Sequence, residues 1–165
     1  MIAAGRALAM ARREVGEGAP QERVLINAKD HLDSMLSTLD SKTSALLRFN
    51  AIVVAALAYL VVVRATDPFA GANTVIKAAG MFVGHLSLVA SVVSCGFAFP
   101  VIGIGREFLG ALPGEDRGSR LPEEAEIEAL GKVVERRVTL YRWAWRLAVT
   151  GGSGFAILVG LATIH

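Results

Sequence analysis

Two charged residues, Asp40 and Lys42, interrupt an apolar-striped stretch shortly before the first strongly hydrophobic segment. Because they are two positions apart, they point about 200° from each other on a helix, so they do not form an i,i+4 pair and each needs its own partner. A guanidinium at Arg136 or Arg137 on a neighbouring helix suits Asp40. Lys42, with Arg48 further along, suits an anionic ligand. The alternative is that both charges are solvated and only mark a membrane boundary.

Other residue patterns offer little chemistry. The chain has three histidines and one cysteine, Cys95, so an internal disulfide is excluded, and the spacing of these residues predicts no metal site. The glycines between Gly103 and Gly110 follow an apolar segment and lack the Lys-Ser/Thr ending of a phosphate-binding loop. No nucleophile elbow is present. We therefore expect no enzyme activity, no metal and no cofactor.

The composition is that of a membrane protein. Of the 165 residues 53% are hydrophobic, and the 17 glycines bring this share to about 63%, against roughly 45–50% in soluble chains counted in the same way. Only 19% of residues are charged. With 17 basic and 15 acidic residues, the chain does not have the extended basic surface that nucleic acid requires.

Three segments are apolar enough to cross a bilayer, at about residues 45–64, 80–104 and 143–164. Residues 21–47 and 122–142 have apolar side chains at helical spacing and lead directly into the first and third segments. The sequence therefore predicts an all-α membrane protein with about three transmembrane helices, of which the first and third extend into the cytoplasm as amphipathic helices.

Basic residues set the expected orientation. Residues 1–48 hold seven Lys and Arg, residues 64–79 hold two, residues 106–142 hold seven, and no basic residue follows Arg146. The positive-inside rule then places the N-terminus in the cytoplasm and the C-terminus outside. We expect residues 1–20 to be a flexible or surface-bound tail and residues 21–164 to be a single helical membrane domain.

Small residues repeat on two of the expected spans. Gly152, Ala156 and Gly160 recur every four residues in the third, and the second carries a similar set, Gly84, Ser87 and Ser91. Such faces let helix backbones approach closely. They would serve helix packing either within one chain or between subunits.

The stretch HLDSMLSTLDSKTSALLRFNAIVVAALA, residues 31–58, resembles the membrane effectors of the Pycsar antiphage system, whose partner is a pyrimidine nucleotide cyclase. The resemblance covers the layout of residues 22–164. It is carried by the residues Asp40, Lys42, Ala45, Leu46, Leu47 and Tyr141 to Trp145. Thr43 departs from the pattern, because the family usually has alanine there.

This resemblance implies a function. In that system the cyclase makes cyclic CMP or cyclic UMP during infection, and the effector responds by impairing the inner membrane, which causes abortive infection. It implies a homo-oligomer in the bacterial inner membrane, whose link to the cyclase is the diffusible nucleotide. From the charges themselves, we expect Asp40, Lys42, Arg48, Arg136 and Arg137 to be the ligand-binding residues. The alternative is a regulatory or scaffolding membrane subunit that forms no pore and binds no nucleotide.

Overall fold

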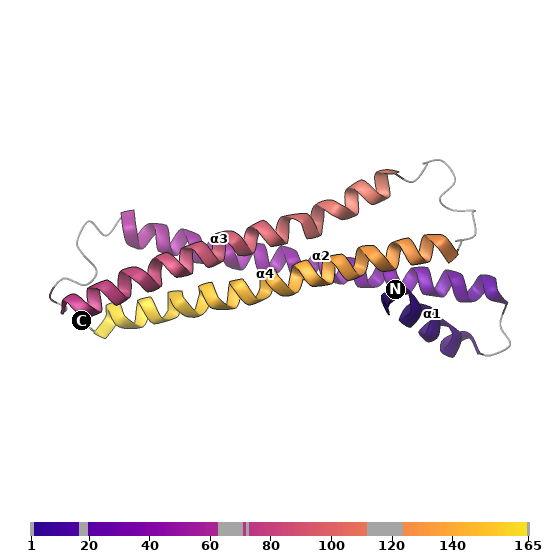
Figure 1. Ribbon diagram of the computed structural model, residues 1–165, viewed down its shortest axis with the longest axis horizontal. Helices are drawn as coiled ribbons and strands as arrows, with labels where there is room; N and C mark the ends of the chain where they lie inside the picture. Colours follow the sequence, from indigo (N-terminus) through magenta and orange to yellow (C-terminus); the bar gives the residue numbers. More distant parts are fainter. Residues whose placement is uncertain (1, 17–19, 63–70, 72, 112–123, 165) are drawn as a thin grey trace. The chain divides into compact units, whose positions relative to one another are not determined.

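The computed structural model describes residues 2–16, 20–62, 71, 73–111 and 124–164. Its four helices are α1 (Ile2–Val15), α2 (Gln21–Val62), α3 (Thr74–Ala111) and α4 (Glu124–Ile164) (Figure 1). Three of them, α2, α3 and α4, are long and apolar enough to cross a membrane. The prediction of an all-α membrane protein with about three transmembrane helices is confirmed.

The long helices follow from local sequence. No glycine or proline lies within the 42 residues of α2, so nothing stops the amphipathic first half from continuing into the apolar second half. Large apolar side chains are exposed in the apolar segments, for example Ile52 at 68%, Phe82 at 70% and Ile157 at 55%. Side chains of this kind are stable on a helix surface that contacts lipid.

Helix α3 is longer than the span expected at residues 80–104. It begins at Thr74, just after Asn73, whose backbone carbonyl accepts the Lys77 N–H at 3.1 Å. It also continues through Pro100 to Ala111, beyond the expected end of the span. Neighbouring helices and local adjustments often satisfy the carbonyl that a proline leaves free in a membrane helix.

The chain divides into two compact units. The first, here the head unit, comprises Met1–Thr43 and Pro100–Tyr141, and the second, the span unit, comprises Ser44–Phe99 and Arg142–His165. Helices α2 and α4 each contribute residues to both units. The expectation of a single helical membrane domain over residues 21–164 stays a prediction.

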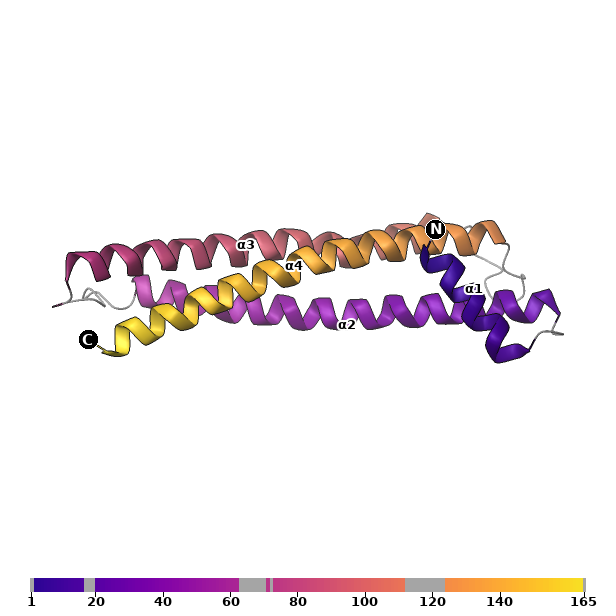
Figure 2. The same cartoon turned by 60° about the horizontal axis from the view of Figure 1, so that its bottom comes forward.

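The core of the head unit is built from α1, α2 and α4. Residues of α1 lie against the first turns of α2 and α4, and the two views in Figures 1 and 2 agree on this placement. The buried residues are Ala4, Ala7 and Ala11 of α1, Val24, Ala28 and Leu32 of α2, and Ile127, Leu130 and Val134 of α4. Removing these side chains from water stabilises the head unit.

Residues 2–15, which we expected to belong to a flexible or surface-bound tail, form helix α1, and this helix packs against α4. A Cβ added to Gly131 of α4 would lie 2.6 Å from Cβ of Ala4, so the two helix backbones approach closely. The Ala3 N–H donates to Oε1 of Glu135 at 2.9 Å, which satisfies one of the free donors at the start of the helix. The tail is therefore a packed helix that docks through alanine onto glycine.

The helices of the span unit meet along a buried seam, to which α3 and α4 contribute small residues. Its buried positions include Asn50, Val53 and Leu57 on α2, Ser87, Ser91 and Ser94 on α3, and Ala144, Ala148 and Gly151 on α4. Each set recurs at alternating steps of three and four residues, the spacing that keeps one face of a helix against its partners. Small side chains here allow close contact of helices within a bilayer.

Candidate functional site

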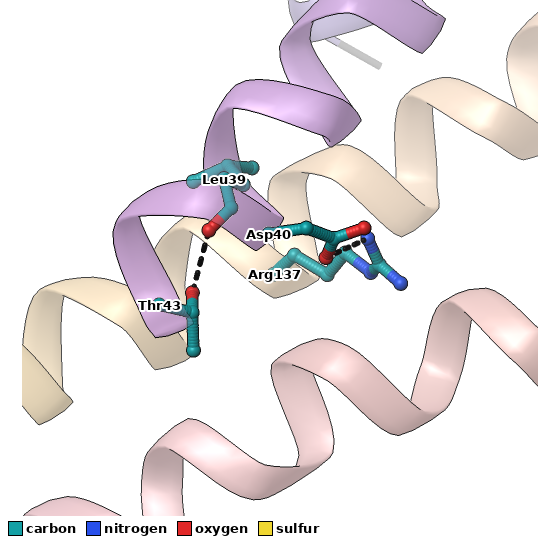
Figure 3. Close-up of polar contacts among 4 residues, drawn as sticks. All are labelled: Leu39, Asp40, Thr43 and Arg137. Atoms are coloured by element: carbon teal, nitrogen blue, oxygen red, sulfur yellow. Dashed lines mark hydrogen bonds and ion pairs between the residues drawn. The ribbon is translucent and has the colours of Figure 1, made fainter. Parts of the chain in front are cut away.

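Asp40 and Arg137 meet across α2 and α4 in the head unit. Nη1 of Arg137 donates to Oδ1 of Asp40 at 3.1 Å, and the two side chains point toward each other in Figure 3. Of the two arginines that suited Asp40, the structure brings only Arg137 to it, because Arg137 follows Val134 on the buried face of α4. Arg136, one position earlier, is exposed.

The two members of this pair differ sharply in burial. The Arg137 side chain is 1% exposed, whereas that of Asp40 is 48% exposed. Nε and Nη2 of Arg137 are buried without a hydrogen-bond partner among the described residues. A guanidinium has five N–H donors and stays charged inside a protein, so each buried donor without a partner costs free energy. The bond to Asp40 thus offsets only part of the free-energy cost of burying the Arg137 guanidinium.

A second ion pair lies in the same register. Nζ of Lys29 is 3.0 Å from Oε1 of Glu126, and both this pair and Asp40–Arg137 join residues 97 positions apart. The two pairs are eleven residues apart on each helix, close to three full turns, so they lie on the same side of α2 and α4. The charges are reversed between them, since α2 gives the cation in one pair and the anion in the other. A slip of either helix would break both contacts.

Thr43 is the next buried residue after Asp40 on α2. It is fully buried, and its hydroxyl donates to the carbonyl of Leu39 at 2.7 Å (Figure 3). The hydroxyl is thereby satisfied within its own helix, so Thr43 leaves no free polar group here.

Lys42 and Arg48 do not assemble with this pair. Both side chains are exposed, and neither makes an ion pair or hydrogen bond with another residue in the described ranges. Arg136 is likewise exposed and without such a contact there. An anion site built from Lys42 and Arg48 therefore stays a prediction from the sequence.

A polar relay crosses the span unit. Nδ2 of Asn50 donates to Oγ of Ser94 at 2.8 Å, and Ser94 in turn donates to the carbonyl of Ala144 at 2.7 Å. Ser87 donates to the carbonyl of Gly151 in the same manner. The serines are seven residues apart and so are their acceptors, so these bonds fix the antiparallel register of α3 and α4.

Two buried polar atoms in this seam have no partner among the described residues. They are Oδ1 of Asn50 and Oγ of Ser91. A Cβ added to Gly151 would overlap the Ser91 hydroxyl and lie 3.1 Å from the carbonyl oxygen of Ser87, so only glycine fits there without a shift. The helices are thus held by polar contacts that are incompletely satisfied.

The small-residue face expected on α4 is not the one that the span unit buries. Gly152 faces the Phe49 ring, but Ala156 is exposed, and no atom of the described residues lies within 4 Å of a Cβ added to Gly160. A repeat of four residues advances about 400°, so it drifts around the helix, whereas alternating steps of three and four stay on one face.

The small-residue set expected on α3 does lie inward. Ser87 and Ser91 are buried, and an added Cβ at Gly84 would make ordinary contact with Leu158 at 3.6 Å. Sequence reasoning missed Asn50, Ser94 and Gly151. The alternating spacing of Ser87, Ser91 and Ser94 was the available signal for them.

The acidic residues of the head unit do not gather into a metal site. Within the described ranges, no group of three His, Cys, Asp or Glu side chains is placed to hold a metal ion. Partial burial raises the pKa of Asp33, with Asp30 and Glu126 adding to the rise and Lys29 opposing it. The sequence matches no protein-family model, no curated protein and no solved structure.

Proposed function

We propose that this chain is a membrane effector of antiphage defence, which cyclic UMP or cyclic CMP activates and which then impairs the inner membrane and causes abortive infection. The observation that carries the proposal is the Asp40–Arg137 pair. Asp40 belongs to the motif by which the chain resembles the Pycsar effectors, and its partner is a buried cation whose Nε and Nη2 have no hydrogen-bond partner among the described residues. A group of this kind suits a switch, because a small rearrangement changes its energy strongly.

The pair is located where such a switch would be effective. Asp40 and Arg137 each lie in the last helical turn that α2 and α4 contribute to the head unit. Nucleotide binding to the head unit would shift the equilibrium between two arrangements of these helices. The size of the shift is set by the difference in the nucleotide's affinity for the two arrangements. The same two helices supply part of the span unit, whose seam depends on the Asn50–Ser94 relay.

The chain lies in the bacterial inner membrane in this proposal, with a defined orientation. The N-terminus lies in the cytoplasm and the C-terminus outside the bacterial inner membrane, in accord with the distribution of basic residues. Copies of the chain form a homo-oligomer in the lipid bilayer, and a pyrimidine cyclase acts on it only through its diffusible product. The chain itself has no catalytic role and does not bind nucleic acid.

Trp143 and Trp145 support a membrane interface at the start of the third span. Both are exposed by more than half, and the Arg146 guanidinium lies over the Trp143 ring, 5.5 Å from its centroid. Exposed tryptophan beside arginine is typical of the level of lipid headgroups. A reporter that works only in the periplasm should be active when it is fused after His165. Activity of a cytoplasm-specific reporter at the same position would contradict the proposed orientation.

The function is tested by expressing the chain in bacteria together with a cyclase that makes cyclic UMP or cyclic CMP. A membrane-impermeant dye should enter the cells only when the cyclase is active, and a catalytically inactive cyclase is the matched control. If dye stays out of cells with abundant chain and nucleotide, the proposal is wrong and the scaffolding alternative is favoured.

A further inference from the structure

A cavity lies at the end of the head unit where α1 ends and where α2 and α4 begin. Its volume is about 640 Å³, within the range of pockets that hold small organic ligands. Leu8, Gln21 and Glu124 represent the three helices that line it. The cavity is remote in sequence from Asp40 and Arg137, and the sequence motifs do not include its residues.

Local structure places two arginines at this cavity. Helix α1 ends at Val15. The next residue, Gly16, has a φ of +92°, a conformation that residues with side chains rarely adopt, and its N–H donates to the carbonyl of Arg12 at 3.1 Å. Arg12 and Arg13 therefore lie in the last turn of α1, where cations are favoured, and both line the cavity. Two guanidinium groups at one cavity suit the phosphate of an anionic ligand.

A second part of the lining is polar but offers acceptors in place of cations. Nε2 of Gln21 donates to Oε1 of Glu124 at 2.9 Å, a contact that joins the first residues of α2 and α4. This bond leaves the Gln21 carbonyl and the second Glu124 oxygen as hydrogen-bond acceptors. Acceptors of this kind suit the N–H groups on the edge of a planar heterocycle.

Apolar side chains complete the lining. Val24 is buried in the core of the head unit, and Leu8 and Leu25 are half-buried beside it. They provide a surface against which the face of a ring can pack. The cavity thus combines cations for a phosphate, acceptors for the edge of a base and an apolar surface for the face of the base. A nucleoside phosphate carries all three of these groups.

We propose that this cavity binds a nucleoside phosphate, with the phosphate at Arg12 and Arg13 and the edge of the base at Gln21 and Glu124. The proposal rests on the proposed function for the choice of pyrimidine and deepens it by giving the ligand a site. A ligand held there contacts α1, α2 and α4 together, so its binding would favour one arrangement of the head unit over another.

The test measures direct binding to the purified full-length chain in lipid nanodiscs. The probes are cyclic UMP, cyclic CMP, uridine and inorganic phosphate. We expect the cyclic nucleotides to bind, and the double variant Arg12→Gln/Arg13→Gln to lose about tenfold or more in affinity, because charge-assisted hydrogen bonds to phosphate are lost. Arg6→Gln is the matched control, because Arg6 is an exposed arginine of α1 that does not line the cavity.

A second variant tests the base-binding wall. Gln21→Leu should weaken binding of the cyclic nucleotides and leave the affinity for inorganic phosphate unchanged. Circular dichroism should show equal helix content for the parent and all variants. The inference is overturned if the parent binds neither cyclic nucleotide, if inorganic phosphate binds as tightly as they do, or if the double variant binds them like the parent.

Failure of the site and failure of the function give different results. If cyclase-dependent dye entry is normal in Arg12→Gln/Arg13→Gln cells, the cavity is not the site although the function stands. If the parent binds cyclic nucleotide through these arginines but no dye enters the cells, the cavity is a site although the proposed function is wrong.

Discussion

Arg137 donates a hydrogen bond to Asp40 across 3.1 Å, and it does so from a position where its own side chain is almost wholly buried. The aspartate is half-exposed, so the cost of burial falls mainly on the arginine. The two halves of this pair should therefore respond differently to mutation.

Asp40→Ala should destabilise the head unit by about 1–3 kcal/mol, because it leaves a buried guanidinium without its carboxylate. Arg137→Met should be near neutral or stabilising, since an apolar side chain of similar length replaces a buried charge that is only partly compensated. Thermal unfolding followed by circular dichroism measures both effects. Equal destabilisation by the two variants would show that the pair offsets the full cost of burying the Arg137 charge, against our account.

Gly151→Ala should weaken the span unit by about 1–3 kcal/mol, because the added methyl group overlaps the Ser91 hydroxyl and crowds the Ser87 carbonyl. Gly160→Ala is the matched control, since nothing lies within 4 Å of its added Cβ. Stability is measured by unfolding in detergent. A larger loss at Gly160 than at Gly151 would mean that the seam lies on the face first expected from the four-residue repeat.

Ser94→Ala should cost about 0.6–2 kcal/mol, because it removes both the acceptor of the Asn50 amide and the donor to the Ala144 carbonyl. Ser91→Ala, a matched change one turn away, should be neutral or stabilising, since its hydroxyl is buried without a partner among the described residues. The same unfolding measurement compares them. If Ser91→Ala is the costlier change, the Ser91 hydroxyl stabilises the fold, against our account.

Asp33→Asn should stabilise the head unit at neutral pH. Partial burial raises the pKa of this carboxyl above its ordinary value of 3.8, so ionisation weakens folding as the pH rises through the raised pKa. The gain in stability from Asp33→Asn should vanish below pH 3.8, the ordinary pKa, because the parent carboxyl is then protonated in both the folded and the unfolded state. A stability difference that does not change between acid and neutral pH would contradict this origin.

Glu128→Gln should change the stability in the opposite direction from Asp33→Asn. The Lys132 ammonium, 3.0 Å from this carboxylate, lowers the pKa of Glu128 by its hydrogen bond and charge. A lowered pKa stabilises the fold above the ordinary value, and this effect is lost as the pH falls through the lowered pKa. The variant should therefore lose stability at neutral pH, but only slightly, because the pair is exposed.

The sequence was informative where large or charged residues carry the pattern. Unbroken apolar spacing predicted that amphipathic helices continue into the spans, and charge complementarity restricted the partner of Asp40 to Arg136 or Arg137. It was uninformative where packing depends on small residues. Ala4, Ala7 and Ala11 offer too little apolar area to distinguish a packed helix from a frayed tail, until the close approach to Gly131 is known.

The effect of Pro100 was also beyond local reasoning. Proline normally ends or bends a helix, and the neighbouring glycines strengthen that expectation. In α3 the helix continues through Pro100 to Ala111, and Ala98 before the proline and Val101 after it are both buried. Tertiary contacts of this kind are not visible in a single stretch of sequence.

The most direct test of the central claim uses the purified chain alone, reconstituted in liposomes that contain a self-quenched dye. Addition of cyclic UMP or cyclic CMP should release the dye from liposomes with the parent chain, while those with Arg137→Met, inserted to the same extent, should stay intact. Arg136→Gln should release dye like the parent. No release from the parent at any nucleotide concentration, or equal release from Arg137→Met, would contradict the account.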